Sequence, residues 1–67
     1  MEHVLKESLE KGIPVTIIYM SGDRITERTV SVRGIRDGLV RAYCHMRKEP
    51  RVFKLANILA AHYCRTG

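Results

Sequence analysis

The chain has 67 residues and a formal net charge of +5, with 12 lysine and arginine residues against 7 aspartate and glutamate residues. A chain this short forms one domain with a small core, which excludes a second domain. Its charge favours a polyanion such as nucleic acid or a nucleotide as partner and disfavours an acidic target surface.

The N-terminal residues, the apolar segments and the cysteines indicate where in the cell the protein is located. Residues 1–12 carry neither the basic start nor the unbroken apolar run of a secretory signal, and no window approaches the roughly 20 apolar residues of a membrane span. Two cysteines, Cys44 and Cys64, without a signal peptide are poor evidence for a disulfide framework. We therefore expect a reduced, cytoplasmic protein with no membrane partner.

The first predicted element is an amphipathic helix over residues 2–11. Its apolar or small side chains recur at helical spacing, at Val4, Leu5, Ser8 and Leu9, and charged residues fill the other face. Gly12 followed by Pro14 supplies a stop. We expect this helix to cover the open end of a barrel.

Five short strands are predicted after the helix, over residues 15–20, 24–35, 39–45, 51–55 and 58–63. They are separated by tight turns at 21–23 and 37–38, a charged loop at 46–50 and a single 3₁₀ turn at 56–57. Gly34, inside the long strand, permits the bend that a small barrel needs. The predicted fold is mainly β, a single domain over 1–67 with the helix at 2–11 and a closed five-stranded antiparallel barrel at 13–64.

The hairpin that begins at residue 39 carries the main functional signal. In its first strand Val40, Ala42 and Cys44 share one parity, which we expect to point to the core, and the residues between them point outward. In its second strand Arg51 shares the inward parity of Phe53, but it is the first residue of the strand, where a barrel opens to solvent. A cation at a barrel mouth suggests an anion site.

Further cations extend this signal into a predicted polyanion surface. Arg51 and Lys54 are its centre, with support from Arg28, Arg33, Arg41 and Arg47, because guanidinium groups match phosphate oxygens. Tyr43 has the outward parity and can stack on a base, lie in a subunit interface or cover the helix. Lys54 has the opposite parity to Arg51 and should point to the other side of the sheet. The alternative is a solvated basic face without a ligand.

Two other chemistries are weighed and set aside. Cys44, His45, His62 and Cys64 are of the types that bind zinc, but the first two are adjacent in a strand and point oppositely, so a buried apolar Cys44 is the default. Asp23, Glu27 and Asp37 lie in turns or on an exposed strand, and no serine precedes a partner base. We expect a non-enzyme without metal or cofactor.

With the elements placed, residues 13–61 resemble a WYL domain, the Sm-type variant of the small SH3-like barrel found in many bacterial transcriptional regulators. The matching features are an Ile/Val-rich strand ending in Tyr19, then Gly22, Arg28-Thr29-Val30, Ala42-Tyr43-Cys44 and Arg51-x-Phe53-Lys54-Leu55-x-x-Ile58. The departures are Gly38-Leu39-Val40 in place of the Trp-Tyr-Leu tripeptide, Val32 in place of a proline, and Asn57 in place of a basic residue.

The resemblance implies a basic pocket that binds nucleic acid or a nucleotide-like effector. By position, Arg51 and Lys54 carry over to that pocket, and Tyr43 and Arg28 do so more loosely. It also implies regulation of transcription together with a DNA-binding regulator protein. The alternative function is a protein-interaction or homo-oligomer-forming module that binds no nucleic acid.

Overall fold

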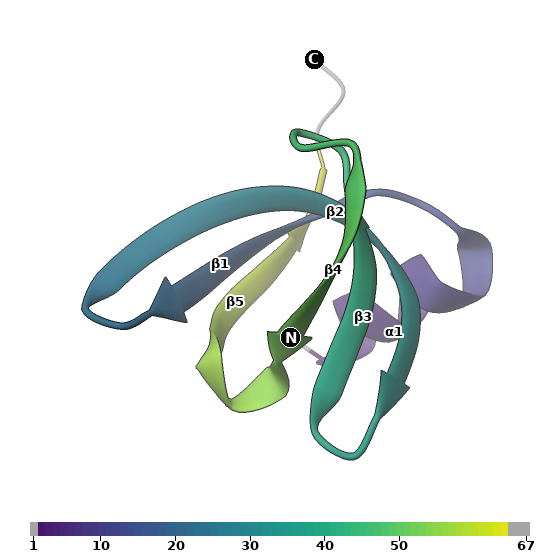
Figure 1. Cartoon of the computed structure of the whole chain (residues 1–67). Helices are drawn as coiled ribbons and strands as arrows, with labels where there is room; N and C mark the ends of the chain where they lie inside the picture. The colour runs from purple at the N-terminus through teal and green to yellow at the C-terminus, as the bar shows by residue number, and fades with distance from the viewer. Residues whose placement is uncertain (1, 65–67) are drawn as a thin grey trace.

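The computed structural model describes residues 2–64 and contains one helix and five antiparallel strands in a single sheet (Figure 1). The elements are α1 (Glu2–Lys11), β1 (Val15–Ser21), β2 (Arg24–Arg36), β3 (Leu39–Cys44), β4 (Glu49–Lys54), the 3₁₀ turn η1 (Leu55–Asn57) and β5 (Ile58–Tyr63). This confirms the predicted mainly β fold, with one helix, five antiparallel strands and a 3₁₀ turn before the last strand. No helix in the described part of the chain has the length and apolarity to cross a bilayer.

The strands lie in the order β4-β3-β2-β1-β5, and each neighbouring pair is antiparallel. The register shifts between Val32 and Gly34, so the predicted bend in the long strand is a β-bulge at Arg33. The turn at Asp37 and Gly38 has positive φ at both residues (51° and 74°), the backbone that a two-residue hairpin loop favours. β4 starts at Glu49 and contains Pro50, which an edge strand tolerates because one side of its backbone needs no ladder partner.

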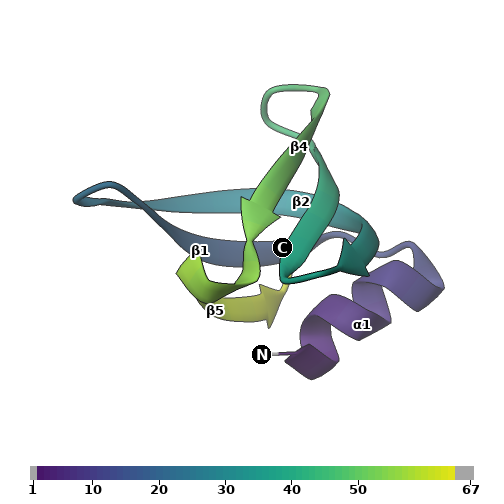
Figure 2. The same ribbon diagram turned by 60° about the horizontal axis from the view of Figure 1, so that its bottom comes forward.

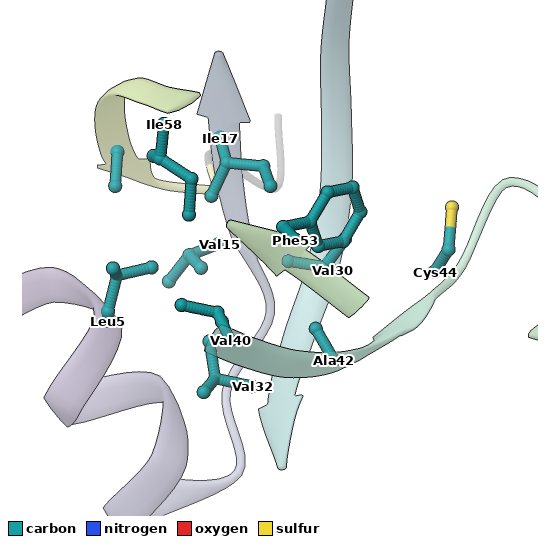
Figure 3. Packing of buried hydrophobic residues seen from close by; sticks show 11 residues of the cluster. Leu5, Val15, Ile17, Val30, Val32, Val40, Ala42, Cys44, Phe53 and Ile58 are labelled. Atoms are coloured by element: carbon teal, nitrogen blue, oxygen red, sulfur yellow. The ribbon is translucent and has the colours of Figure 1, made fainter. Parts of the chain in front are cut away.

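Side chains from the helix and from every strand form one core, alternating along β1 and β3 and interrupted by the register shift in β5 (Figure 3). Its buried members are Leu5 from α1, Val15, Ile17, Val30, Val32, Val40, Ala42, Cys44, Phe53, Ile58 and Ala61. The expected inward parity of Val40, Ala42 and Cys44 is confirmed, and Cys44 is a buried apolar residue whose thiol is free. The inner face of the sheet is therefore the core face.

The sheet curls around this inner face, and in the view of Figure 2 β4 passes in front of β1 and β2. As a result the ring of Phe53 in β4 reaches the ring of Tyr19 in β1, with centroids 4.9 Å apart in an edge-to-face arrangement. Within residues 2–64 no ladder joins the two edge strands, β4 and β5, which η1 connects. Full closure into a barrel stays a prediction.

The helix α1 docks on the sheet through a buried serine. The ladder between β1 and β2 ends at Val15 and Val30, so the backbone N–H of Val32 lies beyond it and donates instead to Ser8 Oγ at 2.9 Å. The Ser8 hydroxyl donates in turn to the carbonyl of Ile13 at 2.6 Å. Leu5 packs beside it with no exposed surface. One side chain thus satisfies the buried N–H of Val32 and the partly buried carbonyl of Ile13.

The outer face of the helix carries a surface ion pair. Lys11 Nζ lies 2.9 Å from Glu7 Oε2, one turn away. The hydrogen bond lowers the pKa of the Glu7 carboxyl and raises the pKa of the Lys11 ammonium from their ordinary values. Because both groups are in contact with solvent, the pair contributes little to stability.

Candidate anion-binding site

The β1–β2 hairpin extends beyond the rest of the sheet. β5 pairs with β1 only as far as Tyr19, and β3 pairs with β2 only from Val30 onward, so the outer part of the hairpin pairs only with itself (Figure 1). In β2, Arg28 points to the same inner side of the sheet as the core residue Val30, because the two residues share one parity. The inner face therefore becomes polar where the core ends.

A pocket of about 390 Å³ lies at this end of the inner face, between the hairpin and β4. Its lining residues are Tyr19, Ser21, Arg24, Thr26, Arg28, Arg51, Val52 and Phe53. The edge-to-face rings of Tyr19 and Phe53 connect it with the core, since Phe53 is buried and Tyr19 packs against the core cluster. We call it the arginine pocket. Its volume lies within the range of small-molecule sites, roughly 300–1,000 Å³.

Three guanidinium groups line the arginine pocket, and no carboxylate does. Arg51 is half-buried and lies opposite the buried Ala42 of β3, which places it on the inner face. Arg28 is also half-buried and donates from Nη1 toward Met46 Sδ at 4.0 Å, whereas Arg24 is exposed. Among residues 2–64, none of these three arginines forms an ion pair. The arrangement concentrates uncompensated positive charge around an aromatic surface.

Such an arrangement is suited to an anion with phosphate oxygens. Guanidinium groups donate bidentate hydrogen bonds to phosphate, and they keep their charge at all physiological pH values. The half-buried ring of Tyr19, backed by the buried ring of Phe53, offers an apolar surface at the same place. A phosphorylated ligand with an apolar or aromatic part would contact both.

The structure brings together only some of the residues predicted for the site. Arg28 and Arg51 meet in the arginine pocket, and Arg24 joins them although it was not predicted. The alternation of Arg24, Thr26, Arg28 and Val30 along β2 contained the signal for Arg24, because these residues share one face. Arg47 lies exposed in the turn between β3 and β4.

The remaining predicted residues lie on the other side of the sheet. Arg41 and Tyr43 alternate with the buried Val40, Ala42 and Cys44, and Lys54 alternates with the buried Phe53. Arg33 sits at the bulge with its Cζ atom 6.0 Å from the centroid of the Tyr43 ring. The expected separation of Lys54 from Arg51 is therefore confirmed. We call Arg33, Arg41, Tyr43 and Lys54 the outer basic face.

The histidines and cysteines do not gather. His45 Nε2 lies 2.7 Å from the buried hydroxyl of Ser31, and its ring packs edge-to-face on Tyr43 at 5.3 Å. Cys44 points into the core, while His62 is exposed and Cys64 is half-buried after β5. In the described range 2–64, no group of three side chains suited to metal binding is present.

No protein-family model matches this chain, and no curated protein matches it either.

Proposed function

We propose that this chain is a WYL-like ligand-binding module of a cytoplasmic regulator, which binds a nucleotide-like phosphorylated anion in the arginine pocket and thereby adjusts transcription. The observation that carries the proposal is the convergence of Arg24, Arg28 and Arg51 around Tyr19 and Phe53, without a carboxylate among the lining residues. The overall positive charge adds a field that attracts anions. The proposed role is one of binding and not of catalysis.

The regulatory part of the proposal needs a partner. The described residues contain one α-helix, and a helix-turn-helix unit needs two. We propose that a DNA-binding regulator, in the same chain or another, supplies contact with promoter DNA. The ligand would act by binding one state of that assembly more tightly than another.

The test is a titration with three phosphate probes: inorganic pyrophosphate, a fluorescent nucleoside diphosphate and a short single-stranded oligonucleotide. At low salt the nucleotide should bind more tightly than pyrophosphate, because only the nucleotide reaches the aromatic surface. Arg51→Gln should weaken nucleotide binding about tenfold, the effect of losing one charge-assisted hydrogen bond of roughly 1.5 kcal/mol.

Lys6→Gln is the matched control, because it removes the same charge from the exposed side of α1, away from the arginine pocket. It should bind the nucleotide as the wild type does. The proposal fails if wild type binds neither pyrophosphate nor the nucleotide at low salt, or if Arg51→Gln and Lys6→Gln lose the same affinity.

A second candidate function has its own observation. Large apolar residues are exposed on β2 and β5: Ile25 is 64% exposed and Leu59 is 47% exposed. β5 is also an edge strand of the sheet. Exposed apolar groups beside a strand edge suit a protein-interaction or homo-oligomer-forming module. Light scattering on a size-exclusion column distinguishes it: a stable oligomer that binds none of the three probes favours this candidate.

A further inference from the structure

The outer basic face lies on the sheet surface opposite the arginine pocket and has a built aromatic centre. Tyr43 is half-buried, with the Arg33 guanidinium over its ring at 6.0 Å and the His45 ring against its edge at 5.3 Å. His45 is itself held by Ser31 Oγ at 2.7 Å. Two neighbours, Arg33 of β2 and His45 of the turn after β3, therefore contact the tyrosine ring.

Further cations continue from this ring along the same face. Arg41 lies two residues before Tyr43 on β3 and points to the same side. Lys54 of β4 pairs with Leu39, so it is the diagonal neighbour of Arg41 across the ladder. The outward positions of the β3–β4 ladder are Leu39, Arg41, Tyr43, Pro50, Val52 and Lys54, and none of them is acidic. Asp37, in the neighbouring turn, lies beside Arg36, with 3.6 Å between its Oδ2 and Arg36 Nε. The β3–β4 ladder therefore has no carboxylate on this face, and Glu27, which shares the outward parity of Ser31, lies farther out along β2.

We infer that the outer basic face binds single-stranded nucleic acid, with one base stacked on Tyr43 and phosphates held by Arg33, Arg41 and Lys54. Single strands offer unstacked bases and a phosphate at every nucleotide, which this flat combination of ring and cations matches. The exposed Val52, 57% accessible, adds an apolar surface between the cations Arg41 and Lys54. An acidic peptide would satisfy the cations but would leave the ring without a partner.

This inference does not rest on the ligand of the arginine pocket. Along β4, Arg51 and Phe53 point inward and Val52 and Lys54 point outward, so the cations of the two sites lie on opposite sides of one strand, and Val52 alone also borders the arginine pocket. The chain can therefore hold a small phosphorylated ligand and a nucleic-acid strand at once. Each binding activity can be removed without removing the other.

The experiment measures the binding of a short labelled single-stranded oligonucleotide by fluorescence anisotropy between about 50 and 200 mM salt. With three phosphate contacts, the slope of log K against log salt should be about −2, and in Arg33→Gln/Arg41→Gln it should fall to about −0.7. Tyr43→Leu should weaken binding about tenfold, whereas Tyr43→Phe, which keeps the ring, should bind like the wild type. Circular dichroism melts establish that each variant is folded.

Arg51→Gln separates the two sites. It should leave oligonucleotide affinity within about twofold of wild type, although it weakens nucleotide binding in the arginine pocket. The inference is overturned if Arg51→Gln abolishes oligonucleotide binding while the Arg33→Gln/Arg41→Gln variant binds normally, because the strand would then lie in the pocket. It is also overturned if Tyr43→Leu binds as well as Tyr43→Phe, or if a polyglutamate peptide of equal charge competes as well as the oligonucleotide.

Discussion

Replacing Phe53 by alanine should unfold most of the protein at moderate temperature. Phe53 is the only phenylalanine, is 5% exposed, and joins β4 to the core and to the Tyr19 ring. Truncating a buried phenylalanine costs about 3–5 kcal/mol. A domain of this length has a total free energy of unfolding of roughly 3–10 kcal/mol, so the loss is comparable with the whole. Thermal melts followed by circular dichroism should show Tm lowered by more than about 10 °C.

Val52→Ala is the control for this prediction, because Val52 is adjacent in β4 but lies on the outer face and is 57% accessible. It should shift Tm by only a few degrees. If the Phe53→Ala and Val52→Ala variants melt together, Phe53 does not join β4 to the core, and the arginine pocket loses its aromatic surface as well.

The second large effect should follow from Ser8→Ala. The change leaves the buried backbone N–H of Val32 and the partly buried carbonyl of Ile13 without their hydroxyl partner. Leaving such groups unsatisfied costs about 1–3 kcal/mol, although alanine is the better helix former by about 0.5 kcal/mol. Urea unfolding should give a lower midpoint with an unchanged m value. Amide hydrogen exchange should show faster exchange at Val32.

Ser21→Ala serves as the control, since Ser21 is exposed at the end of β1. Its stability should match that of the wild type within about 0.5 kcal/mol. A Ser8→Ala variant as stable as the Ser21→Ala variant would show that the helix is held by Leu5 and its apolar neighbours alone.

The alternation of side chains made the strands predictable. Val15 to Met20 and Leu39 to Cys44 alternate or branch at the β-carbon as half-buried strands do, and the Asp37-Gly38 pair marks the turn between β2 and β3. The boundaries of β4 were less predictable, because proline at position 50 usually ends a strand and only the edge position of β4 allows it.

The grouping of the basic residues depended on features that are not local in sequence. Parity alone separated Lys54 from Arg51, and the sequence grouped Arg28 with Arg51, but adding Arg24 required the curl that brings Phe53 of β4 against Tyr19 of β1. The bulge at Arg33, which sets that side chain over Tyr43, is a property of the β2–β3 register. The role of Ser8 was also hidden, because its partner Val32 is 24 residues away.

The most direct test of the central claim follows the guanidinium Nε–Hε signals of all arginines by NMR during titration with inorganic pyrophosphate. An anion site in the arginine pocket predicts saturable shifts at Arg24, Arg28 and Arg51, with accompanying shifts of the Tyr19 and Phe53 amides. A solvated basic surface predicts small, non-saturating shifts at every arginine in proportion to its exposure. That second result would contradict the proposed function.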